Sequence, residues 1–510
     1  MRLPCPRWNA VRFQIAMIMG FCWLIYLPGC DRPVPKQNTA RPTSDVRLEG
    51  HAGSSQKEPI PEPPFAEVAI QPETRLPSVF PVLTPLKQPI PERVVRPEDH
   101  RPRHDENRLA DAGIRVFESQ RLKLHTDLDP EIARTLPPLI DQVYLAWEEY
   151  FGPLPPDRSG TPFQISGYLM CDVALFRELG LLPEDLQLQH GRHRRNEFWM
   201  RDQSEDYYRR HLVIHEATHC FMMFLPGVEA PVWYLEGMAE DFGTHRLDEN
   251  GKATFRVMAN SPEECAGFGR ITLIREDCAA NKFRSIPSIM QFQSAEFVTP
   301  NHYAWAWGLC QFLDRHPQYH ERFQRLSDFL QGAQLNDKFV EFFAADGQDL
   351  NTEWALFISN LQYGYDVARA SIEFRPGTLL TFDESTRTFK IQADRGWQSS
   401  GVQIETGQTY DISASGRFIL ADQPQPWESE PQGVSIRYFE GHPLGILLAC
   451  IRQDTPEEGE EPMLNVATIG RGRILKAPAT GTLYFRLNDA WNSLNDNKGH
   501  VTVKISLVSG

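Results

Sequence analysis

Two histidines and a glutamate interrupt an otherwise apolar segment, HLVIHEATHCFMMFL, which spans residues 211–225. If this segment is helical, His215 and His219 lie on one face, with their Cβ atoms about 6 Å apart. At that spacing, two neutral imidazoles can share one Zn²⁺ ion at about 2.1 Å from each nitrogen. Glu216 lies beside this face, where its carboxylate can take a proton from a zinc-bound water. The spacing therefore predicts a hydrolytic zinc site with Glu216 as general base.

A third zinc ligand must come from another element. His211 shares the helical face, but it lies two turns from His219, about 12 Å along the axis, and is not expected to bind the same ion. PVWYLEGMAEDFG at 231–243 predicts the next helix, with Glu236 and Glu240 on one of its faces. Glu236 is expected to complete a His₂Glu zinc set, and Glu240 to accept the spare N–H of a ligand histidine. The alternative is a helical core with solvated polar positions, which is disfavoured because unpartnered polar groups in an apolar helix are costly.

HEATH followed by WYLEGMAED resembles the gluzincin metallopeptidases of the thermolysin-like peptidase MA clan. In that family the third zinc ligand is the glutamate of a W-x-x-EG-x-A-type segment. The resemblance covers roughly residues 200–330, because IPSIMQFQSAEFVTPNHYAWAWGLCQFLDRHPQY is similar to the later helix of bacterial peptidase-MA-like proteins of otherwise undefined function. It implies a zincin-like fold with the ligands His215, His219 and Glu236 and the base Glu216. The gap between the second histidine and the third ligand is shorter than in the aminopeptidase branch, and no GAMEN-like segment is found, so endopeptidase activity is expected over aminopeptidase activity.

Tyr303, in the segment NHYAWAW, is a candidate catalytic residue. The resemblance implies a role for it, because gluzincins commonly place a hydroxyl donor near the zinc to stabilise the developing oxyanion. The alternative is a packed aromatic side chain, and the sequence does not choose between the two.

A second cluster of polar residues lies near the C-terminus, in RLNDAWNSLNDNKGHVTVKISL. Asp489, Ser493, Asp496 and Asn497 fall between two expected strands. Oxygen ligands at this density suit a hard cation, with Ca²⁺ the first choice. The alternative is an Asn/Asp-rich hairpin turn.

This stretch is similar to the calcium-dependent galactophilic lectin of bacteria, whose closing strands carry an ND…NN-x-G segment that binds calcium and sugar together. The likeness covers about residues 390–510, including SGVQIETGQTYDISASGRF and GHPLG. The sequence reads HPLG where the family has a longer, more polar segment after HP. The resemblance implies calcium binding by the side chains of Asp489, Asp496 and Asn497 and the backbone oxygens of Ser493 and Leu420, with His442 approaching the sugar.

Two folded domains are needed to position these groups, since 510 residues exceed what one core usually serves. Apolar residues at helical spacing dominate 106–370, and period-two runs such as GTLYFRLND and HVTVKISLV dominate 371–510. The predicted class is α+β: a mainly helical zincin-like metallopeptidase domain followed by an antiparallel β-sandwich of lectin or galactose-binding type. Residues 31–105 hold 15 of the 40 prolines and are expected to form a disordered linker.

Residues 1–30 have the features of a signal peptide. Three arginines precede an apolar run at 13–27 that is too short to span a bilayer comfortably. The run ends in LPGC, which resembles the lipobox of bacterial lipoproteins and implies acylation of Cys30; the alternative is ordinary secretion. In both cases the protein is expected to be exported, and lipidation would make it a membrane-anchored periplasmic or cell-surface protein without a transmembrane helix.

Charge and cysteine content restrict the partners further. The formal charge of −15 gives no basic footprint for nucleic acid. In an exported protein Cys265 and Cys278 could form a disulfide, with two buried free thiols as the alternative.

The sequence thus predicts an exported, lipid-anchored zinc metallopeptidase, which hydrolyses peptide or glycoprotein substrates and carries a carbohydrate-binding-like domain. One alternative is a non-catalytic cell-surface carbohydrate-binding or scaffold protein that retains a peptidase fold. Another is zinc-dependent hydrolysis of a non-peptide bond, because His₂Glu chemistry also suits other carbonyl centres.

Overall fold

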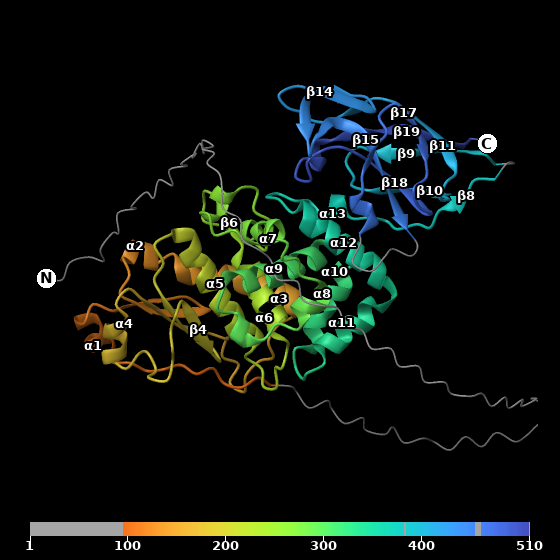
Figure 1. The fold of residues 1–510 in the computed structure, drawn as a ribbon. Coiled ribbons are helices and arrows are strands. Elements are labelled where there is room, and N and C mark those ends of the chain that lie inside the picture. Colours follow the sequence, from red (N-terminus) through yellow and green to blue (C-terminus); the bar gives the residue numbers. More distant parts are fainter. Residues whose placement is uncertain (1–94, 382–383, 454–460, 509–510) are drawn as a thin grey trace, which may run out of the picture. The chain divides into compact units, whose positions relative to one another are not determined.

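The computed structural model describes residues 95–381, 384–453 and 461–508 (Figure 1). Helices and strands both contribute substantially, and the class is α+β. The predicted signal peptide, Cys30 and most of the predicted linker lie outside the described residues. Within them, no helix combines the length and apolarity needed to cross a bilayer.

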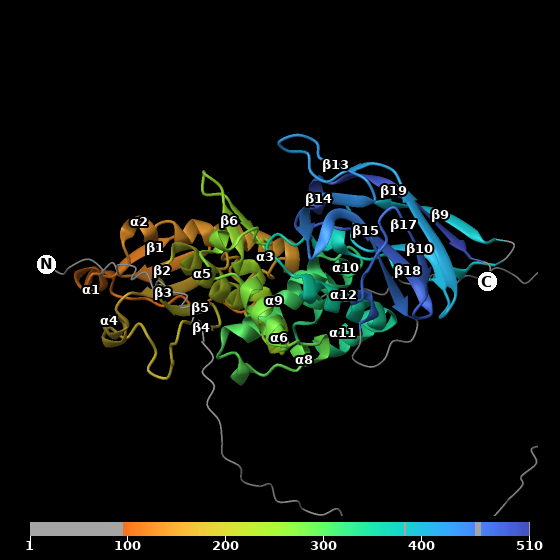
Figure 2. The same ribbon diagram turned by 45° about the horizontal axis from the view of Figure 1, so that its top comes forward.

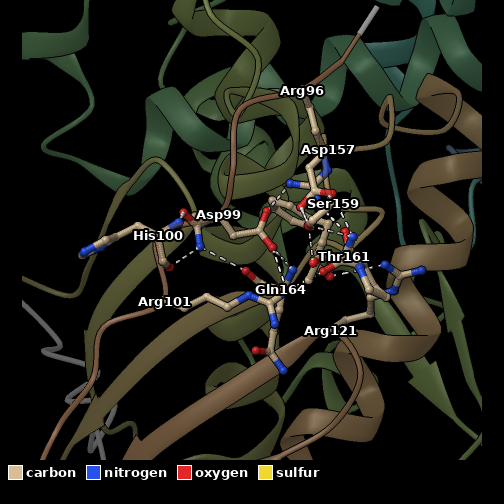
Figure 3. A network of polar contacts seen from close by, with 12 residues as sticks. Arg96, Asp99, His100, Arg101, Arg121, Asp157, Ser159, Thr161 and Gln164 are labelled. Carbon is tan, nitrogen blue, oxygen red and sulfur yellow. Dashed lines mark hydrogen bonds and ion pairs between the residues drawn. The ribbon is translucent and has the colours of Figure 1, made fainter. Parts of the chain in front are cut away.

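The described chain begins with a segment that is fastened to the first domain (Figure 3). Arg96 is only 4% exposed, donates to the backbone oxygen of Thr161 at 2.6 Å and forms an ion pair with Asp99. The other carboxylate oxygen of Asp99 accepts the backbone N–H of Gln164 at 3.0 Å. Residues from Arg96 onward, which the sequence assigned to the linker, are therefore hydrogen-bonded to the segment that leads into the central strand of a sheet.

This sheet has five strands in the order β1-β2-β3-β5-β4. The three inner strands run parallel, and β1 and β4 pair antiparallel to their neighbours, so β4 forms an edge. The strands are β1 (Arg115–Glu118), β2 (Leu122–Thr126), β3 (Ile165–Met170), β4 (Gly191–Arg194) and β5 (Glu197–Arg201).

The sequence prediction of a mainly helical first domain missed this sheet. Its strands are only four to six residues long, and every residue of β3 is buried. A short strand that is buried on both faces has no alternation of polar and apolar residues, so periodicity does not reveal it.

The helices α5 (Asp206–Met222) and α6 (Val232–Gly243) carry the predicted zinc ligands. The loop between them contains Pro226 and Gly227, and Gly227 has φ +78°, a conformation that favours glycine. The next helices are α7 (Arg270–Ala279) and α9 (Pro300–Arg315), and α9 packs closely on α6. A Cβ on Gly237 would lie 2.6 Å from the backbone oxygen of Ala306, so glycine permits this close approach.

Figures 1 and 2 label most of the remaining elements of the first domain. They are α1 (Glu106–Asp111), α2 (Pro130–Ala133), α3 (Leu136–Phe151), α4 (Val173–Glu178), β6 (His245–Leu247), β7 (Ala253–Phe255), α8 (Ile286–Met290), α10 (His320–Gln324), α11 (Leu335–Phe343), α12 (Gly347–Asn360) and α13 (Val367–Ala370).

From β8 onward the structure consists of two six-stranded sheets that share an apolar core. Val402 and Leu483 enter this core from one sheet, and Ile412 and Val503 enter it from the other, which makes the unit a β-sandwich. One sheet contains β14 (Gln432–Phe439), β15 (His442–Gln453), β18 (Gly481–Leu487), β10 (Gln398–Ile404), β8 (Thr378–Leu379) and β16 (Ala467–Thr468); the other contains β13 (Glu428–Ser429), β12 (Phe418–Ile419), β19 (Lys498–Leu507), β11 (Thr409–Ser415), β17 (Gly472–Lys476) and β9 (Thr386–Gln392).

Of the two alternatives for Cys265 and Cys278, the structure shows free thiols and not a disulfide. Cys265 ends a short 3₁₀ helix, and its Sγ lies 3.4 Å from the backbone oxygen of Pro262. The Sγ of Cys278, on α7, lies 3.9 Å from the backbone oxygen of Ile358. The two side chains thus pack against different segments.

Candidate metal centre

The structure brings the three predicted zinc ligands together. His215 and His219 occupy consecutive turns of α5, and both are buried. Their Nε2 atoms lie 3.2 Å apart. Oε2 of Glu236, from α6, lies 3.3 Å from Nε2 of His215 and 3.2 Å from Nε2 of His219. The three donor atoms therefore form a nearly equilateral triangle.

The size of this triangle tests whether a metal ion would fit. Ligands held at about 2.0–2.1 Å in a tetrahedron have donor atoms about 3.3–3.4 Å apart. The observed separations of 3.2–3.3 Å match one face of such a tetrahedron. Two imidazoles and a carboxylate are also a donor set that zinc commonly takes. The residues present fit Zn²⁺, with the fourth position left for water or substrate.

Close packing of the two helices shifts the pKa values of these groups. Burial alone would raise the pKa of Glu236, but His219 and His215 outweigh it and hold that pKa well below its ordinary value. Burial would lower the pKa of His215, but Glu236 and Glu240 outweigh it and raise that pKa to about 10. The carboxylate is thus held in the ionised form that a cation requires.

Glu240 supports the site from behind. Its Oε1 lies 3.4 Å from Nδ1 of His215, the nitrogen that faces away from the donor triangle. Arg270, the first residue of α7, donates to both carboxylate oxygens at 2.6 and 2.8 Å. Such a carboxylate fixes the orientation of a ligand imidazole, which is the role predicted for Glu240.

His211 stays outside the donor triangle. Its Nε2 lies 3.2 Å from Oε2 of Glu240. His211, His215 and Glu240 do form a second compact group of metal-ligating types. The Arg270 guanidinium forms an ion pair with the Glu240 carboxylate of that group, so its positive charge opposes the binding of a second cation there.

Glu216 lies on the sheet side of α5 and is 5% exposed. Its Oε2 is 3.3 Å from Nδ1 of His193, on β4, and the His193 ring stacks on the His219 ring with centroids 4.4 Å apart. Burial would raise the pKa of Glu216, but His193 and the two ligand histidines lower it. The predicted base is therefore ionised and adjacent to the ligands.

His193 was missed by sequence reasoning. It lies more than 20 residues before the motif, in the basic run HGRHRRN, which has no helical or metal-ligand spacing. Only the pairing of β4 with β5, which sets His193 opposite Phe198, brings it to the site.

Tyr303, on α9, lies beside the centre, with its ring centroid 6.0 Å from that of His215. Its hydroxyl donates to the backbone oxygen of Phe297 at 3.2 Å, and its ring makes an edge contact with Phe297. Burial is the main reason that its pKa is raised above the ordinary tyrosine value, so the hydroxyl keeps its proton. Both alternatives for Tyr303, a packed aromatic and a hydroxyl donor close to the ligands, remain predictions.

The polar cluster of the sandwich lies in the loop between β18 and β19. Asp489 is buried, and its Oδ2 accepts from Nδ2 of Asn497 at 2.9 Å. Oδ1 of Asp496 and Oδ1 of Asn497 are buried, and neither has a hydrogen-bond partner among the described residues. Ser493 is half-buried, and its hydroxyl donates to Asn492 at 3.2 Å. Oxygen atoms that lack hydrogen-bond donors fit a hard cation such as Ca²⁺.

Burial raises the pKa of Asp489 to about 6, even though Asn497 and the backbone N–H of Ala490 donate to its carboxylate. His442 begins β15, and its Nδ1 lies 3.2 Å from the Thr468 hydroxyl. Its backbone oxygen accepts from the side chain of Asn488, which directly precedes Asp489. His442 is thus joined to the cluster through the backbone, while its ring is turned to Thr468.

Comparisons with known proteins give little support beyond this geometry. No protein-family model and no curated protein matches the chain. A solved structure described as "EclA N-terminal domain; PllA-like lectin" is 23% identical, and the match covers 24% of this chain and 99% of that one, with a TM-score of 0.20. A TM-score this low carries no argument about a shared fold or ligand.

Proposed function

We propose that this protein is a zinc-dependent metallopeptidase. The observation that carries the proposal is the triangle formed by Nε2 of His215, Nε2 of His219 and Oε2 of Glu236, whose sides match a tetrahedral zinc site. When bound, zinc would lower the pKa of a coordinated water and polarise a carbonyl.

The chain's own residues supply the proton transfers. Glu216 is ionised and lies next to the ligand His215 in α5, so it can accept a proton from the attacking water and deliver it to the leaving amine. Tyr303, whose ring centroid lies 6.0 Å from that of His215, would stabilise the developing oxyanion if its hydroxyl released the Phe297 backbone oxygen and turned toward the site.

The edge strand favours a peptide as the substrate. β4 pairs with β5 on one side only, so its other edge offers free backbone groups within the described part of the chain. An extended peptide can add to such an edge through main-chain hydrogen bonds. His193, on the same strand, contacts Glu216, so a peptide held there would lie beside the proposed base.

The test is to measure the zinc content and the peptide hydrolysis of the purified protein without its predicted signal peptide. We expect one zinc per chain, and cleavage of quenched-fluorescent peptides that a zinc chelator abolishes. Glu216→Gln should retain zinc and lower kcat by about 10²–10⁴-fold, whereas Glu205→Gln, at the start of the same helix, should change neither.

Zinc binding without hydrolysis of any peptide in a diverse library would favour a non-catalytic scaffold, and cleavage of esters alone would favour a non-peptide substrate. Full peptidase activity in Glu216→Gln would refute the assignment of the base.

For the sandwich we propose calcium-dependent carbohydrate binding. The oxygen atoms of Asp496 and Asn497 that lack hydrogen-bond partners within the described residues support a calcium site, and the sequence resemblance to the galactophilic lectin supplies the sugar. A glycan array probed with calcium and again with a calcium chelator tests this role. Binding that ignores calcium would contradict it. Export and lipid anchoring at Cys30 belong to the same proposal and rest on the sequence alone.

A further inference from the structure

The edge strand β4 turns two of its residues toward Glu216. Gly191 is paired with Met200 and His193 with Phe198, and both partners belong to the core that also contains α5 residues. Because side chains alternate along a strand, Gly191 and His193 face α5, whereas Arg192 and Arg194 face away. The alternate positions of β4 therefore form one wall around the Glu216 carboxylate.

His193 makes two contacts at this wall. Its Nδ1 lies 3.3 Å from Oε2 of Glu216, and its ring lies nearly parallel to that of His219, at an interplanar angle of 19°. Within the described residues, the compact donor group comprises His215, His219 and Glu236, and His193 is not a member. The stacked geometry thus directs His193 to the carboxylate and not to the ion position.

Gly191 acts on the same carboxylate by leaving space. A Cβ at this position would collide with Oε1 of Glu216 and lie within 2.9 Å of its Cγ. The φ of Gly191 is not positive, so the backbone itself would accept alanine. Glycine is therefore needed here for room and not for conformation.

We propose that β4 positions the general base: His193 holds Oε2 of Glu216, and Gly191 leaves Oε1 free to accept a proton. His193 is a positioning residue, because it acts through Glu216. The inference rests on the proposed peptidase function and deepens it, since it assigns the orientation of the base to a strand outside the motif.

His193→Phe tests the hydrogen bond, because phenylalanine keeps a ring to stack on His219 but cannot donate. We expect kcat to fall by about 10–100-fold, as for other small misplacements of a catalytic group. KM should change by less than about twofold, and zinc content should not change. His193→Asn, whose amide nitrogen can replace Nδ1, should recover part of the loss. His190→Phe, on the exposed residue just before β4, is the matched control.

Gly191→Ala tests the space beside Oε1. It should lower kcat by a similar factor without loss of zinc. Gly347→Ala is the matched control, because a Cβ there meets nothing within 4 Å and the backbone φ is also not positive. A merely structural role for β4 would instead lower the melting temperature and the zinc content.

A double variant separates positioning from independent catalysis. In the Glu216→Gln background, His193→Phe should cause no further loss, because the group that it positions is gone. A full additional loss would overturn the inference, as would unchanged kcat in both His193→Phe and Gly191→Ala.

A structural readout does not depend on hydrolysis. In a crystal structure of zinc-loaded His193→Phe, the Glu216 carboxylate should be rotated from its wild-type position. If the wild-type protein lacks peptidase activity, the proposed function fails, and this comparison still decides the positioning. An unchanged carboxylate would refute it.

Discussion

The two candidate cation sites differ in how their donor atoms are held. In the metal centre, three donors from α5 and α6 already lie 3.2–3.3 Å apart. In the sandwich, the side-chain donors share one loop, and two of them, Asp489 and Asn497, are hydrogen-bonded to each other. Helices fix the first set in advance, whereas the loop partly satisfies its own polar groups.

This difference determines how much each site must change when an ion binds. A cation at the metal centre meets an ionised carboxylate backed by Glu240 and Arg270, so few atoms have to move, although the raised pKa of His215 means that its ring must release a proton. A cation in the loop must draw in oxygens of Asp496 and Asn497 and replace the amide group of Asn497 that donates to Asp489. We therefore expect zinc to bind a preformed site and calcium to order its loop.

The largest expected effect concerns the preformed site. Glu236→Gln removes the only negatively charged donor of the triangle. Loss of a group that only orients a ligand lowers metal affinity by up to about 100-fold, so loss of this ligand should lower zinc affinity by more than that. Titration against a competing chelator measures this, and Glu229→Gln, an exposed residue just before α6, is the control. Unchanged affinity would mean that Glu236 is not a ligand.

A smaller effect is expected from pH in the sandwich. The folded pKa of Asp489 is raised to about 6, so without calcium the folded state binds the proton more tightly than the unfolded state does. That stabilisation is present below the unfolded pKa and is lost as pH rises toward 6, by about 1–3 kcal/mol. Calcium should reverse the trend, because it binds the ionised carboxylate. Denaturant unfolding at pH 4 to 7, with and without calcium, measures how the free energy of unfolding changes with pH in each case. Asp489→Asn should make the free energy of unfolding less dependent on pH in both. Equal slopes in both media would contradict a calcium role for Asp489.

The smallest expected effect is that of Asp496→Ala on stability, and its direction should depend on whether calcium is bound. Asp496→Ala removes a buried oxygen that lacks a hydrogen-bond partner in the described structure, so without calcium it should be neutral or stabilise by about 1 kcal/mol. With calcium present, the same change should abolish the calcium-induced rise in melting temperature. Asn495→Ala, on an exposed neighbour, is the control. Destabilisation by Asp496→Ala without calcium would indicate an ordinary hairpin turn.

Local spacing made part of the metal centre predictable. Residues four apart in a helix lie on the same face, so His215 and His219 are neighbours on α5 in any environment. The same rule places Glu236 and Glu240 on one face of α6. The strand-rich C-terminal region was also readable, because the hydrophobic period changes from helical to alternating near residue 371.

Other features could not be predicted, because they depend on pairing between distant segments. The buried strands of the first sheet lack alternation, and His193 reaches Glu216 only through the register of β4 with β5. Arg270 was not singled out, since nothing in RITLIRED indicates that its first residue would reach Glu240. The choice between a disulfide and free thiols for Cys265 and Cys278 also stayed open, because their proximity in sequence said nothing about the direction of either side chain.

The sequence by itself determined which residues share a helical face, because covalent geometry and the 3.6-residue turn fix those relations locally. Only the tertiary structure decided that the faces of α5 and α6 meet at the distance a zinc ion requires, and that the edge strand β4 lies against Glu216. Those distances depend on how glycines and aromatic side chains pack between elements far apart in the chain, which no local pattern encodes.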